Sequence, residues 1–409
     1  MKQEDLSYLY HNMNEPRQHT PKSLIISTEE SLSFISMIQI KEVNDKKALR
    51  TFIEFPNILY KGCKQYVPEF SQDLNNLLTP DKNPDLKFCH YKIFLAYNDD
   101  KVCGRVIGII NPRANATWNT KYVRFGFIDF VDNKEVSEAL INAVATWGKD
   151  LGMTAIQGPM GFTDFDKEGM LIGDYDLKSS MATIYNYPYY KDHMEHLGFE
   201  KEADWIQIKI KFPDQLPPRF HRVSEIIKKK FKLHVSSISK KEIYNGKGHE
   251  VFHLLNKAYA PLFGFTPFDD DQITYFLNQY VPLLNTKMMP VVTNEAGEII
   301  GVAITLPSLS NALQKSHGKL LPFGWIHLLK SLKIKYEDTM EMLLIGVRPD
   351  YQGMGVNSLF FEFLLDCKKY GFKYAETCPQ LETNQKELSQ WKDLNPQYIK
   401  PRRCWRKEL

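Results

Sequence analysis

The sequence predicts a mixed α/β (α+β) protein built from two tandem copies of one unit, each a mixed, mostly antiparallel sheet with helices on both faces. The main observation is an internal repeat. A strand hairpin occurs once around Gly104 and again around Gly301, and the same order of strands and helices follows each copy. The chain of 409 residues is 43% hydrophobic and 25% charged, which is enough apolar material for two cores.

The first unit begins with a strand-like run at residues 38–43, followed by the first hairpin at residues 94–110. An Asn-Asp-Asp turn joins the two apolar runs of this hairpin. A third strand is expected at residues 122–130. Apolar residues three to four positions apart then predict a helix over residues 135–151, and Gly152 is a typical stop signal for it. The unit closes with a strand, a helix and a strand, predicted at residues 153–159, 189–197 and 203–210.

The second unit repeats this order. Its hairpin is followed by a strand, a helix that ends at Gly371, and again a strand, a helix and a closing strand. The predicted elements lie at residues 290–306, 341–347, 357–370, 372–379, 385–394 and 402–406.

Composition shifts divide the chain into four segments. Residues 1–36 are polar and irregular and are expected to form a flexible extension. Residues 37–212 form the first unit and residues 236–409 the second. The stretch between them, residues 213–235, starts with a proline-rich run and is predicted to be a linker and a helix.

Charge, cysteines and termini limit the function classes. The 52 basic and 49 acidic residues leave a net charge of +3, so neither nucleic acid nor an anionic membrane is expected as a partner. Six cysteines without a C-x-x-C pair indicate reduced thiols. No secretory signal and no membrane-spanning run is evident, so a soluble, cytoplasmic protein is expected. No metal site is expected, because the histidines have no metal-binding spacing and the acids at 269–271 precede a helix as capping residues do.

The strongest local signal is a strand that runs through Val347 into a glycine-containing turn and then into a helix. Gly353 and Gly355 allow a ligand to approach the backbone closely. The free N–H groups of the first helical turn, with the helix dipole behind them, favour an anion at this place. The pattern therefore predicts a diphosphate cradle formed mainly by backbone amides.

This stretch resembles the coenzyme A pyrophosphate motif of the GNAT-type N-acetyltransferases, V-x-P-x-[YF]-[RQ]-x-x-G-x-[GA]. It departs from the motif at Asn357, where that family has glycine or alanine. The order of elements in the whole second half is also similar to that family, whereas the first half is similar to a copy without the cofactor motif. The matching residues are Val347, Pro349, Tyr351, Gln352 and Gly355.

The resemblance implies an acyl-CoA cosubstrate, acetyl-CoA or another acyl-CoA. It places the pantetheine arm along the backbone of Ile345 and Val347 like an added strand. The acyl thioester would lie near Cys378 and Pro379. The residues implied around the pyrophosphate are Gln352, Gly353, Gly355, Val356 and Asn357.

The resemblance also suggests catalytic groups. Glu341 occupies the place of the family's usual base, although an exposed strand-end carboxylate explains it as well. Asn384 either contacts the cofactor or caps the last helix. The tyrosine that often acts as general acid is replaced by Trp391, which leaves Tyr351 and Tyr398 as possible donors.

Two further stretches leave alternatives open. Residues 158–169 mix aromatic and acidic side chains, and they either form a pocket for a cationic or sugar-like acceptor or pack as an ordinary loop. Residues 320–332 are amphipathic and either line the acceptor entrance or pack inward. We expect the first half to shape the acceptor cleft without binding the cofactor.

The predicted function is an acyl-CoA-dependent N-acyltransferase, in which the amine of a small molecule or peptide attacks the thioester directly. One alternative is an aminoacyl transferase of the tandem-GNAT kind that uses aminoacyl-tRNA. The other is a non-catalytic protein that binds acyl-CoA.

Overall fold

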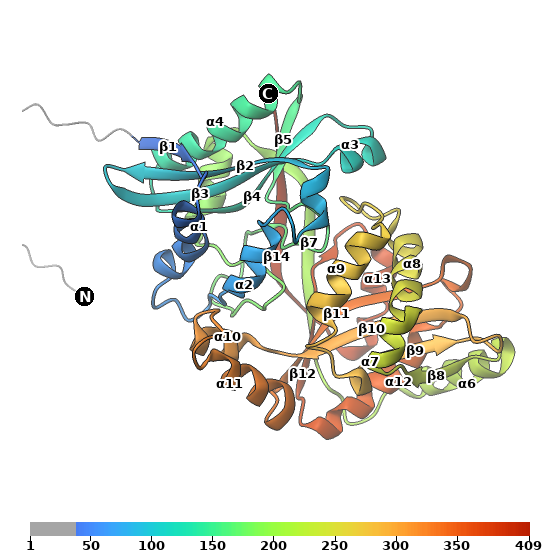
Figure 1. Cartoon of the computed structure of the whole chain (residues 1–409). Coiled ribbons are helices and arrows are strands. Elements are labelled where there is room, and N and C mark those ends of the chain that lie inside the picture. The colour runs from blue at the N-terminus through green and yellow to red at the C-terminus, as the bar shows by residue number, and fades with distance from the viewer. Residues whose placement is uncertain (1–37) are drawn as a thin grey trace, which may run out of the picture. The chain divides into compact units, whose positions relative to one another are not determined.

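The computed structural model describes residues 38–409, so the extension predicted for residues 1–36 lies outside the described residues (Figure 1). Residues 38–409 form one compact unit. Its strands belong to one sheet with the order β1-β2-β3-β4-β5-β14-β7-β12-β11-β10-β9-β8, and β6 and β13 are attached to β14 and β7. The mixed α/β prediction is confirmed.

The elements predicted for the first half occur in the predicted order, together with three α-helices and one short strand that were not predicted. The strands are β1 (Ile38–Glu42), β2 (His90–Asn98), β3 (Lys101–Ile110), β4 (Tyr122–Phe130), β5 (Ala155–Gly158), β6 (Met170–Leu171) and β7 (Glu200–Lys211). The helices are α1 (Lys46–Leu59), α2 (Ser71–Leu77), α3 (Pro112–Trp118), α4 (Lys134–Asp150) and α5 (Tyr189–His196). The next helix, α6 (Pro218–Phe231), lies in the stretch predicted as linker and helix.

The second half repeats this order with additional helices before its hairpin. The strands are β8 (His234–Ser237), β9 (Pro290–Thr293), β10 (Ile299–Pro307), β11 (Thr339–Val347), β12 (Tyr374–Thr377), β13 (Gln380–Leu381) and β14 (Gln397–Glu408). The helices are α7 (Lys240–Glu242), α8 (Gly248–Tyr259), α9 (Asp270–Tyr280), α10 (Ser310–Ser316), α11 (Gly324–Leu329), α12 (Asn357–Asp366) and α13 (Gln385–Ser389). The predicted helix 385–394 is shorter than expected, because α13 ends at Ser389 and a separate 3₁₀ turn covers Lys392–Leu394.

The two glycines that marked the repeat have the same structural role. A Cβ atom on Gly104 in β3 would lie 2.7 Å from Leu140 of α4, and one on Gly301 in β10 would lie 2.9 Å from Phe360 of α12. Real Cβ atoms do not approach carbon atoms this closely, so a larger residue at either position would force Leu140 or Phe360 to shift, and glycine allows the helix to pack closely onto the hairpin. The repeat is therefore a repeat of one helix–sheet contact.

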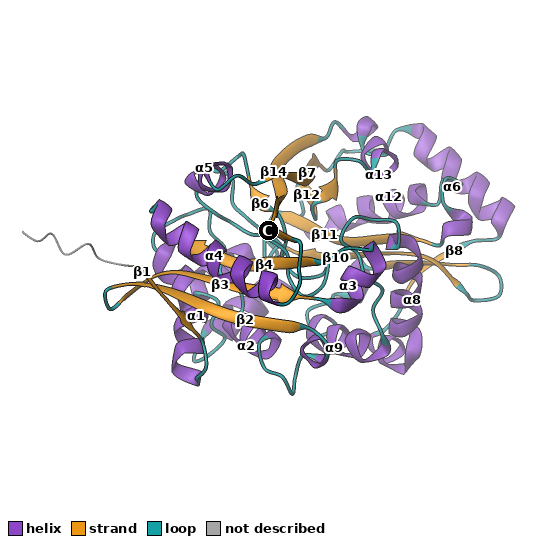
Figure 2. Cartoon of the chain, turned by 90° about the horizontal axis from the view of Figure 1, so that it is seen from above, coloured by secondary structure: helices purple, strands orange, loops and turns teal. Residues whose placement is uncertain are grey.

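Helices cover both faces of the sheet in each half. In the second half, α8 and α9 pack on one face around Phe252 and Phe276, while α6 and α12 pack on the other around Ile227 and Phe360. Figure 2 shows these two helix layers on either side of β10 and β11. Among residues 38–409, no helix is both long and apolar enough to cross a bilayer.

The closing strands are exchanged between the halves. β7 ends the first half but pairs with β12 of the second, and β14 ends the second half but pairs with β5 of the first. β7 and β14 also pair with each other in antiparallel orientation. In Figure 1, β14 runs upward beside β5, so the C-terminus lies in the half that contains the first strands.

Candidate active site

The sheet opens where two parallel strands diverge. β11 and β12 pair over Thr339–Met342 and Tyr374–Thr377, and the amide of Cys378 still donates to the carbonyl of Met342 at 2.9 Å. Beyond this point β11 continues beside β10, whereas the chain after Cys378 turns away and pairs with β7 through β13. The divergence leaves one edge of β11 without a strand partner.

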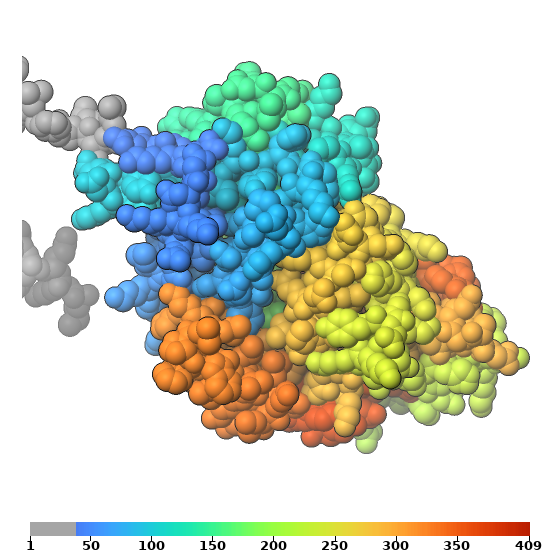
Figure 3. Space-filling view, viewed as in Figure 1, coloured from blue at the N-terminus to red at the C-terminus, as the bar shows by residue number. Residues whose placement is uncertain are grey.

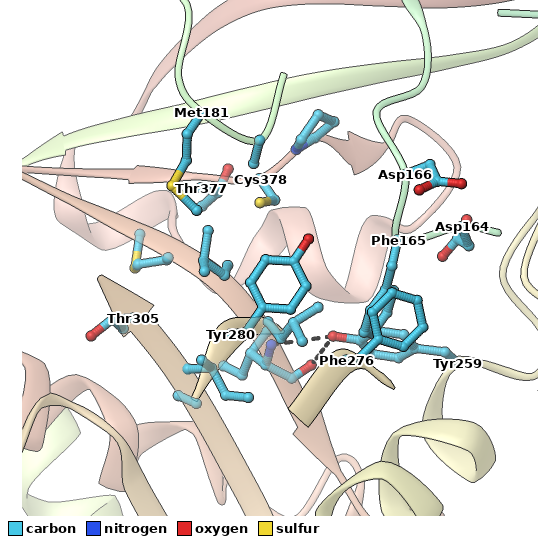
Figure 4. A pocket seen from close by; sticks show the side chains of 18 of the residues that line it. Asp164, Phe165, Asp166, Met181, Tyr259, Phe276, Tyr280, Thr305, Thr377 and Cys378 are labelled. Atoms are coloured by element: carbon cyan, nitrogen blue, oxygen red, sulfur yellow. Dashed lines mark hydrogen bonds between the residues drawn. The ribbon is translucent and has the colours of Figure 1, made fainter. Parts of the chain in front are cut away.

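A cavity of about 370 Å³ occupies this divergence and extends between the two halves of the chain. This volume lies within the range of roughly 300–1,000 Å³ that is typical of small-molecule sites. The lining is mainly apolar. It includes the aromatic residues Phe165, Phe252 and Phe276, and also Leu364 and Trp391. Figure 4 shows Thr377 and Cys378 on one side of it and Asp164 and Asp166 on the other.

Part of the polar lining comes from an acidic loop, residues 164–168, which lies between β5 and β6 in the first half, and Glu69, Asp73 and Glu387 are further acidic residues of the lining. One oxygen of the Asp166 carboxylate accepts from the amides of Phe162 (2.8 Å) and Thr163 (3.1 Å). Oε2 of Glu168 is buried and has no hydrogen-bond partner among the described residues. An oxygen in that state favours a donor supplied by a ligand or by water.

Burial raises the pKa values of these carboxyl groups. The pKa of Asp166 rises to about 7, first because the carboxyl is desolvated and second because Asp85 is close. Desolvation and the neighbouring charge of Asp164 raise the pKa of Glu168 well above its usual range. A carboxyl group that exchanges its proton near neutral pH is suited to general acid–base chemistry.

The free edge of β11 is occupied by a tyrosine. The hydroxyl of Tyr259 donates to the carbonyl of Ile345 at 2.9 Å and accepts from the amide of the same residue at 3.2 Å (Figure 4). Nε2 of Gln352 donates to the carbonyl of Val347 at 3.0 Å. The backbone groups predicted to meet pantetheine are thus engaged by side chains of the protein itself, so a ligand would replace these hydrogen bonds.

The predicted diphosphate cradle has the expected strand–turn–helix form. Gly353 and Gly355 have φ values of +76° and +90°, in the left-handed region that favours glycine. Nothing lies within 4 Å of the position that a Cβ on Gly353 would take, whereas Val223 of α6 lies 2.8 Å from that of Gly355. Val356 is buried and Asn357 begins α12. The turn is accessible on the side of Gly353, and its binding of a diphosphate stays a prediction.

Asn357, where the motif departs, has a definite contact. Its side-chain amide donates to Oε1 of Gln390 at 2.6 Å. This bond ties the first residue of α12 to the segment that follows α13. The asparagine side chain therefore points toward a neighbouring element and has a structural function there.

Glu341 lies beside the cavity. Its side chain is 5% exposed, its register partner on β12 is Glu376, and Oε1 has no partner among the described residues. Burial raises its pKa to about 7, and repulsion by Glu376 adds to this effect. The neighbouring residues Met342 and Leu343 line the cavity, but Glu341 is not among the lining residues. The alternative of an exposed strand-end carboxylate is wrong, because this carboxyl group is buried.

The other predicted catalytic residues are separated in space. Asn384 lines the cavity and also caps α13, since Oδ1 accepts from the amide of Glu387 at 3.3 Å. Tyr398 lies on β14 opposite Ile208, is 50% exposed and is not among the residues that line the cavity. Trp391 is buried and lines the cavity.

Sequence reasoning missed several cavity residues. Tyr259, Tyr275 and Tyr280 all line the cavity, and the hydroxyl of Tyr275 is buried without a partner among residues 38–409. Their positions on α8 and α9 follow the ordinary spacing of a buried helix face, so the sequence held no signal that separated them from core residues.

The acidic stretch at 269–271 is a helix start, with Asp269 and Gln272 forming a capping box. Within residues 38–409, no group of three or more His, Cys, Asp or Glu side chains is arranged to hold a metal ion.

Comparison with known proteins gives relatives at low identity. No family model matches the chain. Protein YghO of Escherichia coli K12 is 24% identical over 329 residues, which are 80% of this chain and 83% of that protein. The bacterial ceramide synthase of Caulobacter vibrioides is 24% identical over 320 residues, which are 78% of this chain and 82% of that protein.

Solved structures with the same arrangement cover nearly the whole described chain. A tandem GNAT protein from the clavulanic acid biosynthesis pathway matches 91% of this chain and 98% of its own, with a TM-score of 0.53 and 10% identity. A GCN5-related glucosamine N-acetyltransferase region in a fungal multi-domain β-N-acetylglucosaminidase matches 91% of this chain and 38% of its own, with a TM-score of 0.53 and 12% identity. The chain has the tandem GNAT fold, and the predicted fold resemblance is confirmed.

Proposed function

We propose that this chain is an acyl-CoA-dependent N-acyltransferase whose amine substrate carries a long hydrocarbon chain. The observation that carries the proposal is the mainly apolar cavity that joins the divergence of β11 and β12 to the acidic loop at residues 164–168. The relative named a bacterial ceramide synthase supports the same reaction class, because a ceramide is the N-acyl derivative of a long-chain amine.

The apolar lining supports a hydrocarbon substrate. Phe165, Phe252 and Phe276 pack against one another beside the cavity, with ring centroids 5.2 to 6.2 Å apart. Such walls offer few hydrogen bonds to a sugar or a peptide, whose polar groups lose water on entry. A hydrocarbon chain gains about 0.8 kcal/mol for each buried methylene group.

The acidic loop supports an amine as the polar end of that substrate. The ammonium form is attracted by the ionised carboxylates of Asp164 and Asp166, and it must lose a proton before the nitrogen can attack. In the proposed step, Asp166 accepts one proton of the ammonium, and the nitrogen of the neutral amine then forms a bond to the thioester carbonyl carbon. The carbon–sulfur bond breaks, and the second proton that the nitrogen loses goes to the released thiolate, which gives the thiol and an amide.

The turn at Gln352–Asn357 is the proposed place of the coenzyme A diphosphate. The open space at Gly353 and the left-handed backbone at both glycines fit a group held by peptide N–H donors. Coenzyme A would supply the activated acyl group. The chain's own contribution is to hold this group at the divergence of β11 and β12, beside Cys378, and to exclude water with the apolar lining.

A coupled assay tests the proposed function. The protein is incubated with acetyl-CoA or palmitoyl-CoA and with primary amines of increasing chain length, and the release of free thiol is measured. We expect release that requires the amine, with kcat/KM rising about fourfold for each added methylene until the cavity is filled. Mass spectrometry of the product should show one amide bond at the nitrogen.

Two outcomes would overturn the proposal. Thiol release that is equally fast with methylamine and with a long-chain amine would exclude a hydrocarbon-binding function for the cavity. Binding of coenzyme A in calorimetry without thiol release from any amine would support the non-catalytic alternative. A requirement for aminoacyl-tRNA instead of acyl-CoA would support the other alternative.

A further inference from the structure

One surface segment exposes apolar side chains that a folded protein normally buries. The basic apolar segment, residues 315–335, includes the end of α10, the loop before α11, α11 itself and the π-helical turn at Lys330–Ile334. Leu321 and Ile334 are each 79% exposed and Phe323 is 69% exposed. No other stretch of similar length within residues 38–409 exposes as many large apolar side chains, and patches of this kind mark interaction sites. Its exposed apolar residues are Leu321, Phe323, Trp325, Ile326, Leu329 and Ile334.

The same segment carries a concentrated positive charge. It contains five lysines and no aspartate or glutamate, although the whole chain has a net charge of only +3. Lys319 forms an ion pair with Glu54 at 2.8 Å. The exposed lysines at 330, 333 and 335 form no ion pair with any described residue. Acidic residues elsewhere balance this local charge, so the net charge of the whole chain does not indicate a membrane partner.

The inner side of the segment is fixed to the protein. Leu328 and Leu332 pack against a cluster that includes Leu313 and Phe70. Nε1 of Trp325 donates to the carbonyl of Pro322 at 3.0 Å, which holds the exposed loop against the first turn of α11. The segment is therefore a fixed projection with an apolar, basic outer surface, and it forms part of the orange lobe at the lower left of Figure 3.

We propose that the basic apolar segment docks on an anionic lipid bilayer. Apolar side chains that enter the headgroup region, together with lysines that pair with anionic lipids, are the combination that interfacial binding requires. A second copy of the chain is a poorer partner, because a symmetric contact would place five lysines against five lysines. This docking does not depend on the acyl-transfer reaction.

The position of the segment links the bilayer to the candidate active site. Phe70 and Leu313, against which its inner leucines pack, also line the large cavity. The inner side of the segment is thus in contact with residues of the cavity wall. If the substrate is a long-chain amine, as proposed above, docking brings the cavity next to the membrane that holds it.

Vesicle co-sedimentation of the full chain tests the docking. We compare phosphatidylcholine vesicles with phosphatidylcholine–phosphatidylglycerol vesicles, without any substrate, and expect binding only to the anionic vesicles, weakened by salt. Lys330→Glu with Lys333→Glu should lower the apparent affinity about 30-fold or more. Leu321→Ser with Phe323→Ser should abolish binding, and both pairs are exposed, so the fold is expected to survive.

Matched variants on another surface serve as controls. Lys229→Glu with Lys230→Glu on α6 makes the same charge change, and Leu151→Ser with Ile226→Ser removes exposed apolar side chains elsewhere. These variants should bind the vesicles like the unaltered chain.

The proposal would be overturned if the unaltered chain did not bind the vesicles, or if the segment variants and the control variants lost vesicle binding equally. A dimer in size-exclusion chromatography that only the segment variants dissociate would also overturn it, in favour of self-association. Thiol release with a short soluble amine, measured in parallel, reports separately on the proposed reaction.

Discussion

Asp166 combines the features of a base at this site, because it lines the cavity and exchanges its proton near pH 7. A base must be deprotonated to act, so kcat/KM should fall about tenfold per pH unit below pH 7. Asp166→Asn should lower kcat/KM by roughly 10²-fold or more and remove the inflection near pH 7. The control is Asp150→Asn at the exposed end of α4. A pH profile of Asp166→Asn that keeps the inflection would assign the base to another group.

Glu341 should control stability more than catalysis. Its folded-state pKa of about 7 is raised from 4.5, so between these values the folded state binds more protons than the unfolded state. The free energy of unfolding therefore falls as pH rises from about 4.5 to 7, by roughly 3 kcal/mol for this group. Glu341→Gln should be more stable than the unaltered chain at pH 8 and equal to it at pH 4.5. Urea unfolding at both pH values measures the difference, and equal stability at pH 8 would contradict it.

Individual site residues were predictable only where they lie in one continuous motif. The turn at Gly353 and Gly355 follows from local sequence, since both its strand and its helix are adjacent to it. The acidic loop was found only as one of two alternatives. The contact between Tyr259 and Ile345 joins residues on separate elements, and no local pattern reports that such a tyrosine faces a free strand edge.

At the scale of elements, the glycine turn allows a test with an isosteric control. Gly353 has open space around it, and aspartate and asparagine tolerate its left-handed backbone about equally. Gly353→Asp should weaken coenzyme A binding at least about tenfold, because its negative charge opposes the diphosphate. Gly353→Asn should bind nearly as well as the unaltered chain. Isothermal titration calorimetry measures both, and equal affinities would place the diphosphate elsewhere.

The tyrosine on the free edge of β11 gives a second test. Tyr259→Phe leaves the partly buried amide and carbonyl of Ile345 unpaired, which should cost about 1 kcal/mol of stability without ligand. Coenzyme A would no longer have to displace the hydroxyl, so the thermal shift that it causes should be larger in this variant. Tyr280→Phe, which also lines the cavity, is the control. A smaller shift in Tyr259→Phe would show that the hydroxyl contacts the ligand.

The elements that were predicted from the sequence lie within a few residues of observed ones, but the helices α1, α2, α3 and α8 and the pairing of the closing strands were not predicted. The predicted strand at 402–406 is the centre of β14, and the predicted helix at 135–151 is α4. Hydrophobic periodicity reports which face of an element is buried. It does not report which of two similar sheet edges a strand joins, and β7 and β14 each join the edge of the other half.

At the scale of the whole molecule, the exchange of the closing strands β7 and β14 between the halves predicts which half a core mutation destabilises. Trp405 of β14 is buried in the core of the first half, whereas Trp391 is buried in the core of the second. Either change to alanine should cost about 3–5 kcal/mol. Hydrogen exchange should be faster mainly in β4 and β5 for Trp405→Ala, and mainly in β11 and β12 for Trp391→Ala. The same pattern of hydrogen exchange in both variants would mean that the two cores open together.

The exchanged strands also constrain how the chain is made. Translation produces the N-terminal half first, but the edge of β5 receives its partner only when the last residues of β14 have left the ribosome. Until then the nascent protein presents an unpaired strand edge, which is a common starting point for aggregation. Shortened products from stalled ribosomes or from C-terminal proteolysis would keep that edge unpaired. The chain therefore needs an intact β14, residues 397–408, to reach a stable native state.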